Sequence, residues 1–121
     1  MGQKVAILGA SKRPDRYSNK AFHMLREYGH TPIPVAPALD EVEGIKAYES
    51  LSQVEEPVDT LTMYVGPMTS KDMAEAIIKL KPKRVIFNPG TENPPLQLAL
   101  AKAGIEVEQA CTLVLLQTGQ F

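Results

Sequence analysis

The residues best suited to chemistry in this chain lie in one basic stretch near the N-terminus. Residues 12 to 20 read Lys-Arg-Pro-Asp-Arg-Tyr-Ser-Asn-Lys, which places four cations in nine positions. Arg13 and Arg16 carry guanidinium groups that can form paired, charge-assisted hydrogen bonds with phosphate oxygens. Ser11 and Ser18 add hydroxyl donors. The stretch as a whole predicts an anion site, although solvated surface charge explains either arginine taken alone equally well.

The elements around this stretch would position it against a ligand. Residues 5–8 form a continuous apolar run, typical of a strand buried on both faces of a parallel sheet. Apolar residues at helical spacing then predict a helix that begins near Ser18 or Asn19, as N-cap, and stops at Gly29. A helix N-terminus directs free N–H groups and the positive end of its dipole at an anion, so the loop from Gly9 onward is a candidate phosphate site.

The rest of the chain repeats the same alternation of strands and helices. Strands are expected at 32–35, 61–65, 84–88 and 105–107. One helix is expected at 69–81, where Thr69 or Ser70 would be the N-cap and Asp72 fits the capping-box spacing. A second helix is expected at 93–103, beginning at Asn93. Residues 40–44 indicate a loop, 45–48 a short extended piece and 50–54 one helical turn, while 111–116 could be strand or helix. This order predicts a single α/β domain over residues 1–121, a Rossmann-like parallel sheet with helices on both faces.

Ligands of such sheets bind beyond the carboxyl ends of the strands, where strand order reverses. We expect that point at the first strand, between the 32–35 and 59–65 strands. Three loops leave strand ends there, at 9–18, 65–69 and 88–93. The candidate binding residues from these loops and from the end of the second strand are Gly9, Ala10, Ser11, Arg13, Arg16, Ser18, Asn19, Val35, Pro37, Val65, Gly66, Pro67, Asn88 and Gly90.

The first loop lacks the usual dinucleotide fingerprint. That pattern needs glycine at three spaced positions, and only Gly9 is present. The second strand also ends in Val35-Ala36-Pro37, where a carboxylate would hold the ribose of NAD. The residues therefore favour a phosphorylated nucleotide other than NAD.

Residues 5–18 resemble the opening of the small stand-alone CoA-binding proteins, which are similar to the CoA-binding domain of the succinyl-CoA synthetase α subunit. The resemblance continues through residues 33–37, Gly44, Tyr48, Leu51, 58–59 and 103–105, and so covers nearly the whole chain. It implies a Rossmann-like domain that holds coenzyme A or acyl-CoA. Residues 9–11 with Arg13 and Ser18 would surround the phosphates, Val35 and Pro37 the adenosine, and 65–67 the next loop.

No catalytic or metal site is expected. Cys111 is the single cysteine and is best explained as a small buried apolar residue. His23 and His30 fit surface positions, and two histidines with one cysteine show no metal-ligand spacing.

The leading hypothesis is thus a non-catalytic CoA carrier, sensor or regulatory module, with a possible partner enzyme. The alternatives are a small NADP-binding oxidoreductase and a partner subunit of an acyl-CoA ligase. A net charge of −1 argues against nucleic acid as a ligand, and no apolar run reaches membrane-spanning length. We expect a soluble, cytoplasmic protein.

Overall fold

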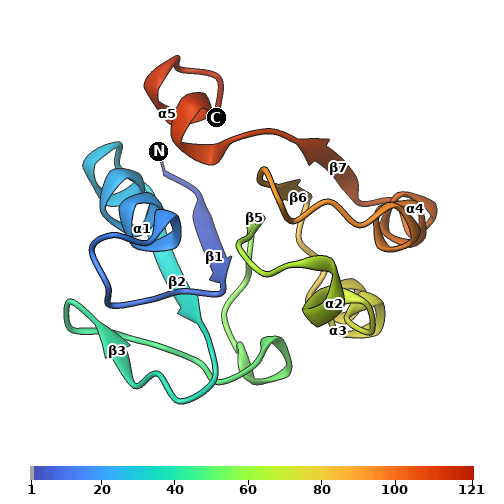
Figure 1. Cartoon of the computed structure of the whole chain (residues 1–121), viewed down its shortest axis with the longest axis horizontal. Helices are drawn as coiled ribbons and strands as arrows, with labels where there is room; N and C mark the ends of the chain where they lie inside the picture. The colour runs from blue at the N-terminus through green and yellow to red at the C-terminus, as the bar shows by residue number, and fades with distance from the viewer. Residues whose placement is uncertain (1) are drawn as a thin grey trace.

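A five-stranded parallel sheet forms the centre of the computed structural model, which describes residues 2–121. The strands are β1 (Lys4–Leu8), β2 (Thr31–Val35), β5 (Thr60–Met63), β6 (Arg84–Phe87) and β7 (Glu106–Gln109), in the order β2-β1-β5-β6-β7 (Figure 1). All four neighbouring pairs are parallel. The predicted fold class is confirmed, as is the position of the first strand between the second and the one near residue 60.

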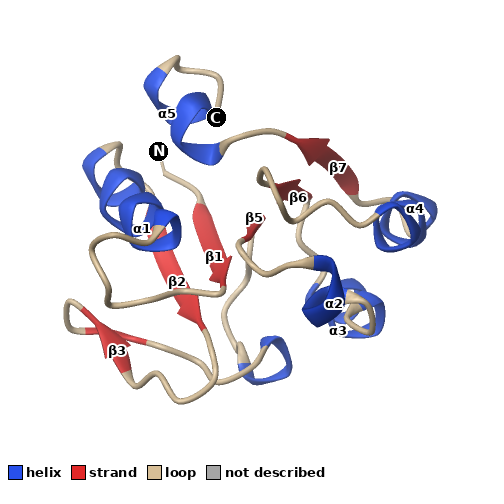
Figure 2. Ribbon diagram, viewed as in Figure 1, coloured by secondary structure: helices blue, strands red, loops and turns tan. Residues whose placement is uncertain are grey.

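Helices cover both faces of this sheet (Figure 2). Helix α1 (Tyr17–Glu27) and helix α5 (Thr112–Gln117) pack together on one face. Helix α3 (Ala74–Leu80) packs against helix α4 (Pro94–Lys102) on the other, with the short α2 (Pro67–Ser70) beside them. The segment 111–116, for which strand and helix were both open, forms most of α5 with Cys111 as the N-cap residue, and it returns the chain to the face that α1 covers.

The alternation of side chains along the strands divides the core between these two faces. On β1, Val5 and Ile7 pack with Phe22 of α1 and Leu116 of α5. Strand residues whose side chains point to the other face of the sheet, such as Leu61, pack with residues of α3 and α4. In β1 and β6, residues 5–8 and 85–87 are buried on both faces, which is why they are continuous apolar runs in the sequence.

Residues 38–58 connect β2 to β5 across the sheet edge. The expected loop at 40–44 is wrong in part, because β3 (Glu41–Val42) and β4 (Ile45–Lys46) pair as an antiparallel hairpin. Its turn residues, Glu43 and Gly44, both have positive φ, at 50° and 80°. The expected helical turn is present as the 3₁₀ helix η1 (Leu51–Gln53).

The predicted single helix over 69–81 is wrong, because the chain forms α2 and α3 with a break between them. Pro67 occupies the first turn of α2, so the helix begins earlier than predicted. Neither helix has a side-chain cap. Ser70 is instead buried, and its hydroxyl accepts a hydrogen bond from the Asn93 amide at 2.9 Å. Helix α4 begins after Asn93 as predicted, and the Asn93 side chain caps it by accepting from the Leu96 N–H.

Candidate functional site

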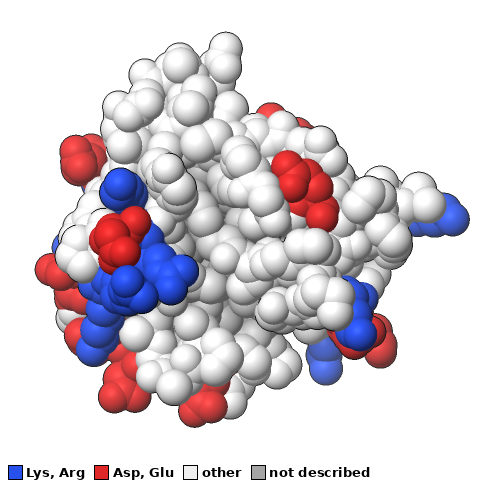
Figure 3. All heavy atoms as spheres, viewed as in Figure 1, with Lys and Arg blue, Asp and Glu red and all other residues white. Residues whose placement is uncertain are grey.

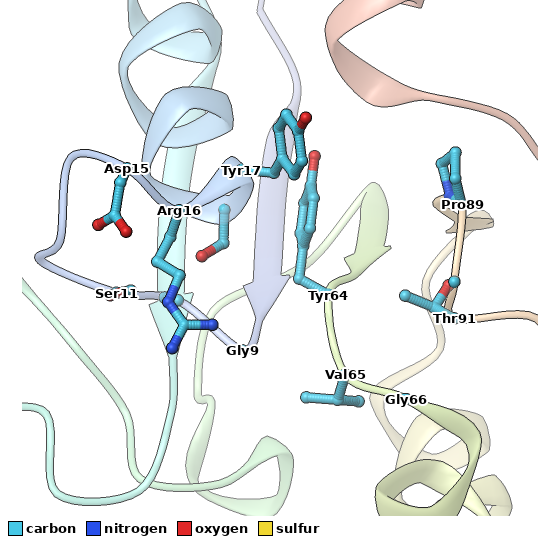
Figure 4. A pocket seen from close by; sticks show the side chains of 13 residues that line it. Gly9, Ser11, Asp15, Arg16, Tyr17, Tyr64, Val65, Gly66, Pro89 and Thr91 are labelled. Atoms are coloured by element: carbon cyan, nitrogen blue, oxygen red, sulfur yellow. The ribbon is translucent and has the colours of Figure 1, made fainter.

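The loops that follow β1, β5 and β6 surround one cleft of about 500 Å³ at the carboxyl edge of the sheet. This volume lies within the range typical of small-molecule sites. Figure 4 shows the three loops converging on it. Its lining consists of Gly9, Ala10, Ser11, Asp15, Arg16, Tyr17, Ser18, Tyr64, Val65, Gly66, Pro89, Gly90 and Thr91.

Gly9 brings the first of these loops close to the second. Its φ is +93°, a conformation that residues with a Cβ rarely adopt. A Cβ at this position would lie 2.8 Å from the carbonyl oxygen of Tyr64. The Gly9 N–H donates to the carbonyl of Val35 at 2.9 Å, which ties the loop to the end of β2 as well.

Helix α1 points its N-terminus at the cleft without a cap of its own. The N-cap residue is Arg16, no side chain caps the helix, and its first turn contains no acidic residue. Within residues 2–121, the N–H groups of Tyr17 and Ser18 make no hydrogen bond. The positive end of the helix dipole is therefore available to an anion.

The predicted capping of this helix by Ser18 or Asn19 is wrong. Both residues lie inside the first turn and are buried. The Asn19 amide instead donates to the carbonyl of Ser11 at 2.9 Å. Asn19 thus holds the loop against the helix and does not itself line the cleft.

Lysine and arginine side chains gather beside the cleft, over the loop between β1 and α1 (Figure 3). Arg16 lines the cleft. Arg13 does not line it, and its guanidinium pairs with the Asp15 carboxylate at 3.1 Å, with both side chains largely exposed. Lys12 pairs with Glu41 at 3.5 Å. Arg16 is therefore the cation best placed to meet a ligand in the cleft.

The structure brings eight of the fourteen predicted residues to the cleft wall. These are Gly9, Ala10, Ser11, Arg16, Ser18, Val65, Gly66 and Gly90. The other six, Arg13, Asn19, Val35, Pro37, Pro67 and Asn88, lie outside the lining. Val35 is fully buried and Pro37 is exposed beyond the end of β2.

Asn88 has a structural environment that sequence reasoning did not anticipate. Its side chain is 2% exposed. The amide donates to Thr62 Oγ1 at 2.7 Å and to the Met63 carbonyl at 2.8 Å, and it accepts from the Thr112 N–H at 2.8 Å. These bonds join the ends of β5 and β6 to the start of α5.

Five lining residues were not among the candidates, namely Asp15, Tyr17, Tyr64, Pro89 and Thr91, and the two tyrosines are the largest of them. Figure 4 shows the two aromatic side chains next to one another at the cleft. Burial raises the pKa of Tyr64 to about 12, although the nearby Thr112 and Thr62 hydroxyls act in the opposite direction. The signal that could have found Tyr64 is its position between the β5 run and Val65-Gly66.

Two further findings concern features that residues 2–121 lack. Residues 2–121 contain no cluster of three His, Cys, Asp or Glu side chains that could hold a metal ion. No helix among them is both long and apolar enough to cross a membrane.

Comparison with known proteins decides the family. The family model for the CoA binding domain matches residues 3–117. The chain belongs to the CoA-binding domain family. The resemblance seen in residues 5–18 is thereby confirmed. A solved structure of an uncharacterised protein is 43% identical to this CoA-binding domain and superposes with a TM-score of 0.94, covering 100% of this chain and 99% of the other.

Curated relatives match over shorter segments. The uncharacterised protein YneT of Bacillus subtilis is 36% identical over 62 residues, which are 51% of this chain and 46% of YneT. The α subunit of ADP-forming acetate–CoA ligase II from Pyrococcus furiosus is 36% identical over 62 residues, 50% of this chain and 14% of the subunit. The matches thus span less than half the length of these relatives.

Proposed function

We propose that this domain binds coenzyme A or an acyl-CoA in the cleft, as a carrier, sensor or regulatory module. The observation that carries the proposal is the uncapped N-terminus of α1, which opens with Arg16 onto a cleft in a chain of the CoA-binding family. The small residues Gly9, Ala10 and Ser11 leave room for phosphate oxygens to approach the main chain.

The ligand would extend along the three loops from this phosphate end. We assign the diphosphate to the N–H groups of Tyr17 and Ser18, the Ser11 hydroxyl and Arg16. The adenosine would lie toward Val35 and Pro37 at the end of β2, as the resemblance to CoA-binding proteins implies. Coenzyme A would supply a thiol for acyl transfer when bound, and the residues of this chain would hold and orient it.

The cleft favours binding over catalysis. Hydrolysis of a thioester needs a base within hydrogen-bond reach of water or of a nucleophile. The described residues that line the cleft include no histidine or cysteine, and the carboxylate of Asp15 is engaged by Arg13. Because one curated relative is a subunit of a ligase, we propose that a partner protein uses the bound coenzyme. The cytoplasmic location expected from the sequence stays a prediction.

Calorimetric titration with CoA, NADP and NAD tests the proposal. NADP carries a diphosphate and a ribose phosphate, as CoA does, so it controls for charge alone. We expect CoA to bind most tightly and its affinity to fall as salt screens the phosphates. A domain that prefers NADP would support the oxidoreductase alternative instead.

A matched pair of arginine variants tests the assigned residues. Arg16→Ala removes the cation at the N-terminus of α1, whereas Arg26→Ala removes the same charge from the exposed last turn of the same helix. Loss of a charge-assisted hydrogen bond costs about 1.5–3 kcal/mol, or roughly 10- to 150-fold in affinity. We expect that loss from Arg16→Ala and little change from Arg26→Ala. Equal affinities in the two variants would remove Arg16 from the site.

A further inference from the structure

A second, smaller hollow lies directly beside the cleft. It has a volume of about 260 Å³ and is lined by Tyr17, Tyr64, Asn88, Pro89, Cys111 and Leu113. Tyr17, Tyr64 and Pro89 line both spaces. The hollow therefore adjoins the cleft, with these three side chains common to both walls.

The lining of the hollow is suited to an apolar group. Two aromatic rings, a proline, a leucine and a thiol form most of its surface. The one amide, that of Asn88, is already engaged by Thr62, Met63 and Thr112. The hollow thus differs from the cleft, where glycines, serines and the end of α1 present polar main-chain groups.

One donor at this hollow has no acceptor. The Tyr64 hydroxyl is buried and is the one such side-chain atom without a hydrogen-bond partner in the described chain. Tyr64 lines the hollow, and its hydroxyl lies close to Thr112 and Cys111 at the start of α5. Its pKa of about 12 keeps it protonated at neutral pH. A buried donor without a partner costs free energy that a ligand acceptor would recover.

We propose that the hollow holds the acyl group of a short-chain acyl-CoA, with the Tyr64 hydroxyl donating a hydrogen bond to the thioester carbonyl oxygen. This inference rests on the proposed binding of CoA in the cleft. A thioester presents one acceptor followed by an apolar chain, which matches one free donor in an apolar hollow. A volume of 260 Å³ equals that of roughly eight or nine water molecules, taking about 30 Å³ for each. Because a methylene group occupies about as much space as a water molecule, the hollow accommodates an acyl group of at most about eight carbons.

The proposal predicts how affinity depends on chain length. Each methylene that enters an apolar site improves binding by roughly fourfold at most. We therefore expect butyryl-CoA to bind more tightly than acetyl-CoA, and acetyl-CoA more tightly than reduced CoA. The gain should stop before decanoyl-CoA, because the hollow is full.

Three variants direct the experiment at the hollow. Leu113→Trp fills it from α5, and Val114→Trp places the same ring at the next position, which is 50% exposed and outside the hollow. Tyr64→Phe keeps the ring and removes the hydroxyl. Equilibrium binding of reduced CoA, acetyl-CoA, butyryl-CoA and decanoyl-CoA is measured for all three and for the parent protein. Binding of reduced CoA reports that each variant is folded.

We expect Leu113→Trp to abolish the preference for butyryl-CoA over CoA and Val114→Trp to retain it. Tyr64→Phe should weaken acyl-CoA binding several-fold more than it weakens binding of reduced CoA. If the parent protein binds CoA and butyryl-CoA equally, or if Leu113→Trp retains the preference, the acyl site is refuted and CoA binding stands. An affinity that keeps rising to decanoyl-CoA refutes the short-chain limit. If neither CoA nor acyl-CoA binds, the proposed function itself fails.

Discussion

Replacing Gly9 by alanine should destabilise the domain more than the same replacement at Gly90. The two glycines have nearly equal φ values, +93° and +90°, and both line the cleft. They differ in their surroundings. A Cβ at Gly9 meets the Tyr64 carbonyl oxygen at 2.8 Å and a methyl of Val65 at 3.0 Å, whereas a Cβ at Gly90 has no neighbour within 4 Å.

The magnitude follows from two separable costs. Holding an alanine at positive φ costs about 1–2 kcal/mol, and this cost is common to both variants. Overpacking against a neighbour that cannot move freely adds about 1–3 kcal/mol, and only Gly9→Ala incurs it. The contact is with main chain of the β5 loop, which cannot rotate away as a flexible side chain would. We therefore expect Gly9→Ala to lose about 1–3 kcal/mol more than Gly90→Ala.

Urea denaturation of the parent and the two variants measures this difference. The free energies of unfolding are compared at unchanged m-value, so that the denatured state is the same for all three. Equal losses in the two variants would refute the reasoning. They would mean that the first loop moves away from Tyr64 at no cost, and that the close approach of the two loops does not depend on Gly9.

Two further predictions concern the stability of the domain. Asn88→Ala leaves the Met63 carbonyl and the Thr112 N–H buried without their partner, so urea denaturation should show a loss of about 2–5 kcal/mol; a loss below 1 kcal/mol would mean that these bonds are dispensable. Burial, and to a smaller extent the nearby Arg84 charge, lowers the pKa of His30 from its ordinary value of 6.5. The unfolded state therefore binds a proton at His30 more readily than the folded state does. The free energy of unfolding should fall as the pH drops below about 6.5. His30→Gln should flatten this dependence between pH 7 and 5, and an unchanged slope would assign it to another group.

Local sequence determined most of the elements of this protein. The run at residues 5–8, the helix that Gly29 ends and the cap at Asn93 depend on burial and hydrogen bonding within a few residues, so pattern alone predicts them. The alternation of strands and helices then restricts the topology, because crossovers between parallel strands are right-handed and short. The family resemblance of residues 5–18 also pointed to the correct family.

Only the tertiary structure decided which polar residues face the ligand. Arg13 and Arg16 are equivalent in the sequence, yet one pairs with Asp15 and the other lines the cleft. The reason is that Arg16 directly precedes α1 as its N-cap, whereas Arg13 lies earlier in the loop with Asp15 within reach. Asn88 follows a strand as a site residue would, but its amide turns inward to bond β5 and α5.

Tertiary packing also explains why the single helix predicted at 69–81 is wrong and why the sequence did not predict the hollow beside the cleft. Ser70 has the local chemistry of a cap, but burial against Asn93 engages its hydroxyl elsewhere. Tyr64 and Leu113 are far apart in the sequence. They share one hollow because the residue after β5 and the start of α5 lie together at the carboxyl ends of the strands. A buried polar group bonds to whatever the packed fold brings within about 3 Å, and an apolar surface forms wherever distant elements pack together. Neither outcome is encoded in the spacing of neighbouring residues.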